Sequence, residues 1–176
     1  MSELRKANTD ATYFLTFTVV GWIDIFTRSR YCDVVIDSLD YCIENKDLDV
    51  FAYVIMPSHI HMVARNLDAN LSGIIRDFKS HTAKTILEMI ENEPGESRKE
   101  WLLHMFKYYA KFHKQNKKYQ FWQKKSHPIE LLSPEMIDQK IEYIENNPVE
   151  SGLVLSPESW MYSSACEQAR IKVLTT

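Results

Sequence analysis

Two histidines in the middle of the chain, His59 and His61, are spaced so that both could bind one metal ion. They flank Ile60 in a stretch, HIHMVAR, whose composition predicts a β-strand. Side chains alternate between the two faces of a strand, so both imidazoles would project from one face and Ile60 from the other. Their Cα atoms would lie about 7 Å apart, within reach of a single ion. Two surface histidines on an edge strand remain the alternative interpretation.

A second pair of polar residues, Tyr143 and Asn147, lies four positions apart near the end of a predicted helix. Residues at i and i+4 share a helix face, and Ile137, Ile141 and Ile144 mark the neighbouring, buried face. A tyrosine at the boundary of the core and an asparagine at a helix end are both common without any function. Tyr143 and Asn147 therefore indicate a functional site only when they are considered together with the histidines.

All four residues together suggest chemistry on a phosphodiester. A metal ion held by two imidazoles and an amide oxygen can polarise a phosphodiester. A nearby phenol oxygen can then attack the phosphorus as a nucleophile. The product would be a phosphotyrosine link, which stores the energy of the broken bond for rejoining. The attack needs in-line geometry, which a side chain on a helix above a rigid sheet can supply.

The elements expected to hold these residues follow the order strand, helix, strand, strand, helix. Hydrophobic periodicity predicts strands at 12–20, 48–56 and 59–65 and helices at 30–45 and 71–91. A ferredoxin-like fold needs one more strand after the second helix. Residues 120–123 and 128–132 are the candidates for it, and a further helix is expected at 100–114.

The tyrosine-bearing helix has a clear start signal. Ser133 is expected as the N-cap, with Pro134 at the first helical position and Glu135 in the first turn. We expect this helix to run to about Asn147, because a proline at 148 disfavours helical backbone before it. The segment after it is expected to pack back over the core.

The sequence thus predicts an α+β chain of one domain spanning residues 1–176. The expected fold is a ferredoxin-like βαββαβ palm with an antiparallel sheet and helices on one face, followed by the C-terminal helix that bears Tyr143.

The overall composition is typical of a globular chain. Its 176 residues are 45% hydrophobic and 26% charged, which is too apolar for a disordered chain. No apolar run approaches the roughly 18 residues that span a bilayer, and the polar start does not match a signal peptide. The three cysteines form no CxxC motif, which argues against a disulfide or zinc framework. We therefore expect a cytoplasmic protein with no membrane partner.

Charge is unevenly distributed along the chain. The formal net charge of -3 argues mildly against nucleic-acid binding, but no acidic residue occurs between Leu103 and Ile129. That basic segment also contains several aromatic residues, among them Trp122. Its lysines are Lys107, Lys111, Lys114, Lys117, Lys118, Lys124 and Lys125. Lysines neutralise phosphates and aromatic rings stack on unpaired bases, although a solvated face of an amphipathic helix would have the same composition.

Four stretches of the chain resemble the REP-associated tyrosine transposases, which belong to the HUH superfamily of single-strand transposases and relaxase-like nucleases. They are YVIMPSHIHMVAR (Tyr53 to Arg65), FWQKKSHPIEL (Phe121 to Leu131), KIEYIENNPVESGLV (Lys140 to Val154) and MYSSA (Met161 to Ala165). They occur in the expected order and span most of the chain. The combination of PxHIH with YIxNNPVxxGLV at this separation is specific to the family.

The resemblance implies a role for each residue at a matching position. His59 and His61 match the metal-binding pair, Tyr143 matches the nucleophile, and Asn147 stands where relatives place a third metal ligand. The implied cofactor is Mg²⁺ or Mn²⁺. The implied partner is single-stranded DNA that carries a hairpin, such as a repetitive extragenic palindrome. Relatives include both dimers and monomers, so a homodimer is one of two open arrangements.

The lysines of the basic segment and Trp122 are then the candidate DNA-binding residues, with Arg76, Lys79 and Lys84 of the second helix as helpers. The implied activity is cleavage and rejoining of single-stranded DNA through a 5′-phosphotyrosine intermediate, which is DNA transposition. One alternative is a domesticated protein that binds hairpins without cutting them. Another is a phosphodiesterase that uses water, in which Tyr143 is only structural.

Overall fold

The structure of the protein, a computed structural model, describes residues 10–92, 94–112, 118–124 and 128–175. The helices and strands within these ranges are β1 (Thr12–Thr18), α1 (Ser29–Lys46), β2 (Asp49–Met56), β3 (His59–Arg65), α2 (Leu71–Asn92), α3 (Lys99–Ala110), β4 (Ile129–Leu131) and α4 (Pro134–Glu150). Short 3-10 turns are η2 (Val20–Trp22), η3 (Ile25–Thr27) and η4 (Pro157–Ser159). The order of the elements agrees with the predicted one.

The sheet has the strand order of a ferredoxin-like fold. Its strands lie side by side as β2-β3-β1-β4, and each neighbouring pair is antiparallel. The parallel strands β1 and β2 are separated by β3, as the split βαβ unit requires. The fourth strand falls in the second of the two candidate segments, 128–132. The first candidate contributes only an isolated bridge between Val19 and Trp122.

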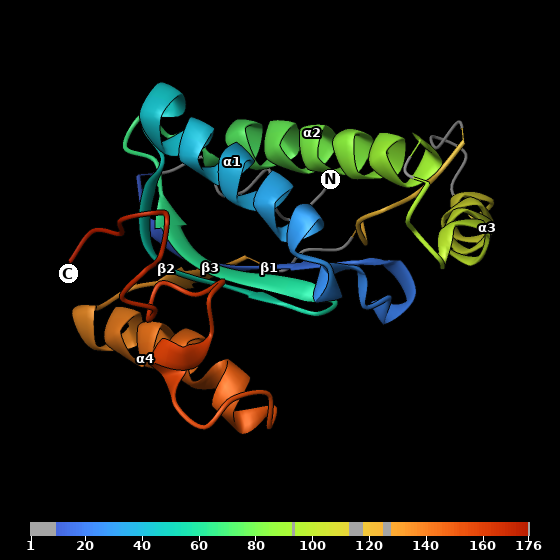
Figure 1. The fold of residues 1–176 in the computed structure, drawn as a ribbon. Coiled ribbons are helices and arrows are strands. Elements are labelled where there is room, and N and C mark those ends of the chain that lie inside the picture. Colours follow the sequence, from blue (N-terminus) through green and yellow to red (C-terminus); the bar gives the residue numbers. More distant parts are fainter. Residues whose placement is uncertain (1–9, 93, 113–117, 125–127, 176) are drawn as a thin grey trace.

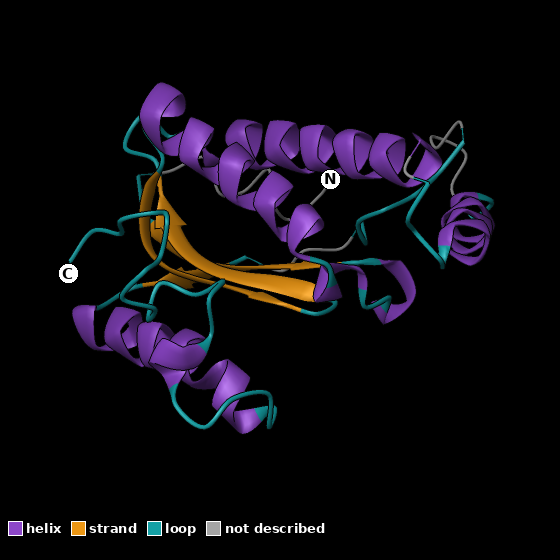
Figure 2. Cartoon of the chain, in the orientation of Figure 1, coloured by secondary structure: helices purple, strands orange, loops and turns teal. Residues whose placement is uncertain are grey.

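The sheet separates two layers of helices (Figures 1 and 2). Helices α1 and α2 cover one face, and α4 lies against the other. A large hydrophobic core fills the space beneath α1 and α2, and Ile60 and Met62 of β3 belong to it. A smaller apolar cluster beneath α4 contains Phe14, Val63 and Ile144. The predicted α+β palm, with paired helices on one face and a separate tyrosine-bearing helix, is therefore confirmed.

Helix α4 begins as predicted and ends later than predicted. The Ser133 hydroxyl caps it by accepting from the backbone N–H of Met136 at 3.4 Å. The helix does not stop at Asn147 but continues to Glu150, with Pro148 inside its last turn. A proline there costs the helix one hydrogen bond, while burial of Ile144, Asn147 and Pro148 holds that turn in place.

The segment after α4 runs along the outer edge of β2, so it packs back on the sheet as expected. Ile55 of β2 donates its N–H to the carbonyl of Tyr162 at 2.9 Å and accepts from the indole Nε1 of Trp160 at 3.0 Å. Further along, Leu174 donates its N–H to the Val50 carbonyl at 2.8 Å. These contacts cover a strand edge that would otherwise expose unpaired backbone groups. None of the described helices is both long enough and apolar enough to cross a membrane.

Candidate active site

His59 and His61 share the face of β3 that lies beneath α4, as the alternation of a strand predicts. Their ring centroids are 4.7 Å apart and their planes are inclined at 76°. Between them, Ile60 points into the core on the opposite face and is almost completely buried. The two imidazoles are thus neighbours on a rigid central strand of the sheet.

Each imidazole is oriented by a hydroxyl group at its Nδ1 atom. Thr16 Oγ1, on the neighbouring strand β1, lies 2.9 Å from His61 Nδ1, and Ser58 Oγ lies 3.3 Å from His59 Nδ1. When Nδ1 carries the proton and donates it to the hydroxyl oxygen, Nε2 keeps its lone pair for a metal ion. Histidines that bind metals are commonly oriented in this way by a partner at the other ring nitrogen.

Burial keeps both imidazoles neutral near pH 7. It lowers the pKa of His61 to about 3, with smaller contributions from the neighbouring His59 and from the positive charge of Lys140. Burial also lowers the pKa of His59. Neutral imidazole is the form that binds metal ions. Neither imidazole would therefore have to release a proton before it bound a cation.

Tyr143 of α4 lies directly against His61 of the same chain. Its ring meets the His61 ring edge-on at a centroid distance of 5.5 Å, and the Phe14 ring at 5.9 Å. Phe14 in turn stacks on His61 at 5.3 Å. The side chain of Tyr143 is 37% exposed, so a substrate can approach it from the solvent side.

A cation, Lys140, accompanies the tyrosine one turn earlier on α4. Its Nζ atom lies 5.3 Å from the centre of the Tyr143 ring and 4.9 Å from that of Phe14. These are distances at which a cation is attracted by an aromatic face. Lys140 therefore brings a positive charge next to the phenol.

Asn147 follows Tyr143 by one turn and points between the directions of Tyr143 and Ile144, because successive residues of a helix are rotated by about 100°. It is buried, and its Oδ1 atom has no hydrogen-bond partner among the described residues. Buried polar atoms are nearly always paired, so an unpaired amide oxygen fits the predicted role as a metal ligand. No group of three or more His, Cys, Asp or Glu side chains that could hold a metal occurs within the described part of the chain.

The basic segment is only partly described. Lys107 and Lys111 are exposed at the end of α3, and Lys124 is exposed beyond it. Lys118 is also exposed but forms an ion pair with Glu91. Lys114, Lys117 and Lys125 lie outside the described residues. Three exposed lysines without a carboxylate partner in the described structure are thus available to bind phosphates.

Trp122 is in the core, contrary to its predicted role in base stacking. It is only 6% exposed and stacks on Phe26 at 5.9 Å. Its indole Nε1 donates to the Thr82 hydroxyl at 3.1 Å. Because both the ring and its N–H are already satisfied inside the protein, no base can reach them in this structure.

The cations of α2 lie on the far side of the sheet from the histidines (Figure 1). Lys79 donates to the backbone carbonyl of Gln123 at 3.1 Å, and burial lowers its pKa to about 8. Arg76 pairs with Asp77 at 2.9 Å, and Lys84 with Glu88 at 3.9 Å. None of these three residues is therefore a free cation beside the candidate active site.

Several residues around the histidines were not predicted as part of the site: Phe14, Thr16, Ser58, Lys140 and Trp22. A usable signal existed for two of them. Phe14 and Thr16 alternate in the first strand, TYFLTFT, and so had to share one face. Which face that was, and that Thr16 lies opposite His61, follows only from the strand register.

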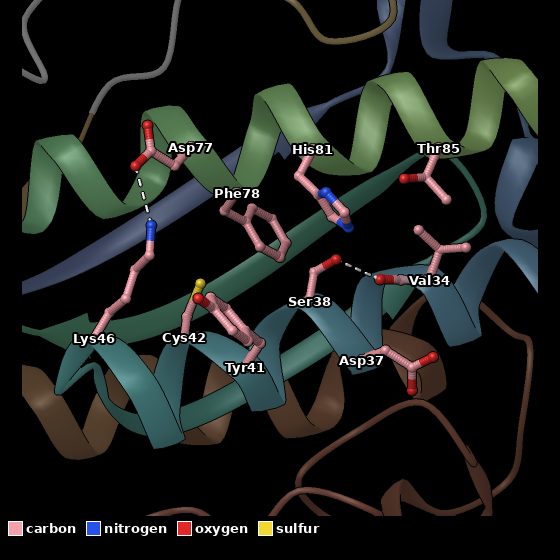
Figure 3. A pocket seen from close by; sticks show the side chains of 10 residues that line it. All are labelled: Val34, Asp37, Ser38, Tyr41, Cys42, Lys46, Asp77, Phe78, His81 and Thr85. Atoms are coloured by element: carbon pink, nitrogen blue, oxygen red, sulfur yellow. Dashed lines mark hydrogen bonds and ion pairs between the residues drawn. The ribbon is translucent and has the colours of Figure 1, made fainter.

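A cleft of about 530 Å³ lies elsewhere, between α1 and α2 (Figure 3). Tyr41, Ser38 and His81 are among its lining residues. Its charged walls are tied together by the ion pair between Lys46 and Asp77 at 3.0 Å. This cleft is separated from His59 and His61 by the sheet, so it is not part of the candidate active site.

Comparisons with known proteins support the fold. No protein-family model matches the sequence, and no curated protein matches it. Among solved structures, the fold is similar to that of a REP-associated tyrosine transposase bound to a REP hairpin. The two chains share 17% sequence identity, the TM-score is 0.62, and the similarity covers 89% of this chain and 77% of the other. At this identity the similarity shows that the two proteins share a fold.

Proposed function

We propose that the protein is a metal-dependent tyrosine nuclease and strand transferase that cleaves and rejoins single-stranded DNA at hairpin sites. The observation that carries this proposal is the contact between Tyr143 and His61, 5.5 Å between ring centroids, within one chain. It brings the proposed nucleophile and the two imidazoles proposed to bind the metal together on one face of the sheet. The similar fold of a transposase bound to a REP hairpin supports the choice of substrate.

His59 and His61 would bind Mg²⁺ or Mn²⁺ through Nε2, and Asn147 through Oδ1. The hydroxyl partners at both Nδ1 atoms and the unpaired amide oxygen fit this ligand set. The bound ion would polarise the scissile phosphodiester and neutralise part of its charge. A small ligand set suits Mg²⁺ and Mn²⁺, which complete their coordination with water and substrate phosphate.

Tyr143 would attack the phosphorus with its Oη atom. A bond forms between Oη and phosphorus, the bond from phosphorus to the 3′-oxygen breaks, and the strand leaves with a free 3′-hydroxyl. The phenol loses its proton to solvent, and the departing 3′-oxygen takes one up. Lys140, next to the phenol, stabilises negative charge that develops on the phosphate. Attack by a 3′-hydroxyl on the phosphotyrosine reverses these steps and rejoins the DNA.

The substrate would be unpaired DNA beside a hairpin. Exposed Lys107, Lys111 and Lys124 would bind its backbone, because lysines displace the counterions of phosphates. Since Tyr143 lies against His61 of its own chain, a single protomer can hold the whole set of catalytic groups. The proposed cleavage therefore does not require a homodimer.

The proposal is tested by incubating the protein with single-stranded hairpin oligonucleotides and Mn²⁺ or Mg²⁺. We expect a covalent protein–DNA adduct on a denaturing gel that disappears with a chelator. The adduct should also disappear in Tyr143→Phe, which keeps the ring contacts with His61 and Phe14 and removes only the hydroxyl. Tyr41→Phe is the matched control, since Tyr41 is exposed on α1 on the other side of the sheet.

Other outcomes would replace the proposal. Binding of hairpins with no adduct on any of them would identify a hairpin-binding protein that does not cut. Cleavage without an adduct, unchanged in Tyr143→Phe, would assign the attack to water and a structural role to the tyrosine.

A further inference from the structure

Trp22 lies beside His59, and its backbone has an unfavourable conformation that leaves the ring exposed to solvent. It ends the turn η2, its backbone φ is 54°, and 60% of the residue is accessible to solvent. Bulky residues rarely adopt positive φ, and conformations of this kind cluster at functional sites. An exposed tryptophan gains little from burial, so the fold itself derives little benefit from this arrangement.

The turn is fixed from two directions. Gly21 has a φ of 63°, and a Cβ atom placed on it would lie 2.6 Å from the Tyr109 hydroxyl of α3. On the other side, Val20 donates its N–H to the Phe121 carbonyl at 2.8 Å, and Trp22 donates to the Val19 carbonyl at 3.1 Å. The exposed ring is therefore presented by a braced loop.

Trp22 lies next to the candidate metal ligands. Its ring meets the His59 ring edge-on at a centroid distance of 5.5 Å. His59 contacts His61, and His61 contacts Tyr143, so the four rings form a connected series with Trp22 and Tyr143 at its ends. DNA whose phosphodiester sits at the histidines would have a neighbouring nucleotide close to Trp22.

The end of α3 continues this surface away from the histidines. Tyr108 and Phe112 are exposed there, with ring centroids 5.1 Å apart, and Tyr108 also contacts Tyr109, which packs on Gly21. Lys107 and Lys111 are exposed beside them. Alternating aromatic rings and lysines are the composition of surfaces that bind single-stranded nucleic acids.

We propose that Trp22 is the stacking platform for an unpaired base of the nucleotide next to the scissile phosphodiester. This inference rests on the proposed function and adds a base-binding subsite to it. A tryptophan face stacks on any base, and one stacked base contributes about fivefold to a hundredfold in affinity. Trp22 thereby fixes the position of the strand relative to Tyr143, while exposed lysines bind its backbone.

The test is a scan in which single abasic sites are placed along a cleavable hairpin oligonucleotide. With the wild-type protein, we expect one abasic position beside the cleavage site to weaken binding about fivefold to a hundredfold. With Trp22→Gly, binding of the intact oligonucleotide should fall by the same factor, and that abasic position should no longer have an effect. Trp22→Phe, which keeps an aromatic face, should restore most of the binding and the abasic effect.

Two controls keep the test decisive. Glycine accepts a positive φ, so Trp22→Gly should keep an unfolding transition close to that of the wild type. Tyr41→Ala removes an equally exposed ring from α1 and should leave the scan unchanged. If Trp22→Gly showed the wild-type abasic profile while adducts still formed, the stacking role would be disproved and the nuclease would stand. If the wild-type protein formed no adduct on any oligonucleotide, the proposed function itself would fail.

Discussion

The two faces of the central sheet are built from the same strands, but one packs the main hydrophobic core and the other carries the candidate active site. On the side of α1 and α2, residues such as Ile60 and Met62 of β3 join a large apolar core. On the side of α4, the alternate residues His59 and His61 each meet a hydroxyl group, and His61 contacts the Tyr143 ring. Successive residues of β3 thus alternate between the apolar core and the candidate active site.

This separation explains how the candidate site can be polar without weakening the fold. The face beneath α1 and α2 carries the larger of the two clusters of buried apolar residues, and burial of apolar area stabilises the fold. The other face needs only a small cluster, including Phe14 and Ile144, to hold α4 in place. Substitutions on the two faces should therefore have different consequences.

The largest effect on activity is expected on the α4 face, from His61→Ala. Loss of one imidazole should reduce adduct formation by roughly a hundredfold or more, because the metal contributes several kcal/mol to stabilising the transition state. The unfolding free energy should fall by about 1–3 kcal/mol, because one hydrogen bond and the ring contacts of His61 are lost. Single-turnover adduct assays and denaturant unfolding measure the two quantities. Equal losses of stability and activity would contradict the separation of the faces.

The opposite result, a large loss of stability with little loss of activity, is expected from a substitution at Ile60. Ile60→Ala should lower the unfolding free energy by about 2–5 kcal/mol, because it leaves a cavity in the large core. Below its unfolding temperature the variant should still form adducts at near wild-type rate. Chemical denaturation, combined with adduct assays on the folded fraction, checks this result. A strongly reduced rate in fully folded Ile60→Ala protein would show that the two faces are coupled.

A smaller effect on activity is expected from Lys140→Ala. Removing the charge next to the phenol should slow adduct formation by about tenfold. Lys140→Arg should retain most of the rate, because it keeps the charge. Rates measured at saturating oligonucleotide separate this effect from weaker binding. Unchanged chemistry in Lys140→Ala would remove this residue from the mechanism.

Cys32, in the large core beneath α1 and α2, should affect how the unfolding free energy changes at high pH. Burial raises the pKa of the Cys32 thiol from 9.0 to about 12, so the folded protein holds this proton while the unfolded chain loses it above pH 9. The corresponding stability is fully present below pH 9 and is lost as the pH rises towards 12. We expect a shallower decline in Cys32→Ala, measured as unfolding free energy between pH 8 and pH 11. Parallel curves for the two proteins would contradict this assignment.

The smallest effect is expected at the start of the tyrosine-bearing helix. Ser133→Ala should cost about 1 kcal/mol of stability through loss of the N-cap, and Ser133→Asp should recover most of it. Thermal unfolding of the three proteins tests this prediction. A stability of Ser133→Ala equal to the wild type would mean that packing alone holds α4.

Much of this arrangement could be predicted from local signals in the sequence. The strand His59–Arg65 has the predicted bounds, because period-2 alternation and a tight turn at Pro57 define it from both sides. The Ser133 cap was also recognisable, since capping needs only neighbours in sequence. Such features depend on a few adjacent residues.

Features that depend on distant partners could not be predicted. An aromatic residue in a basic segment can face either the core or the solvent, and Trp122 faces the core because Thr82 and Phe26 meet it there. Conversely, the predicted strand at 12–20 says nothing about Trp22, which is exposed because the chain turns at Gly21 with a positive φ. Both outcomes are set by tertiary contacts.

The most direct test of the central claim is to identify the amino acid that carries the DNA. The covalent complex, trapped on a hairpin oligonucleotide and digested with nuclease and protease, would be mapped by tandem mass spectrometry. We expect a nucleotide linked through its 5′-phosphate to Tyr143 and to no other residue. A link at another tyrosine or serine, or cleaved DNA with no linked peptide, would contradict the proposed mechanism.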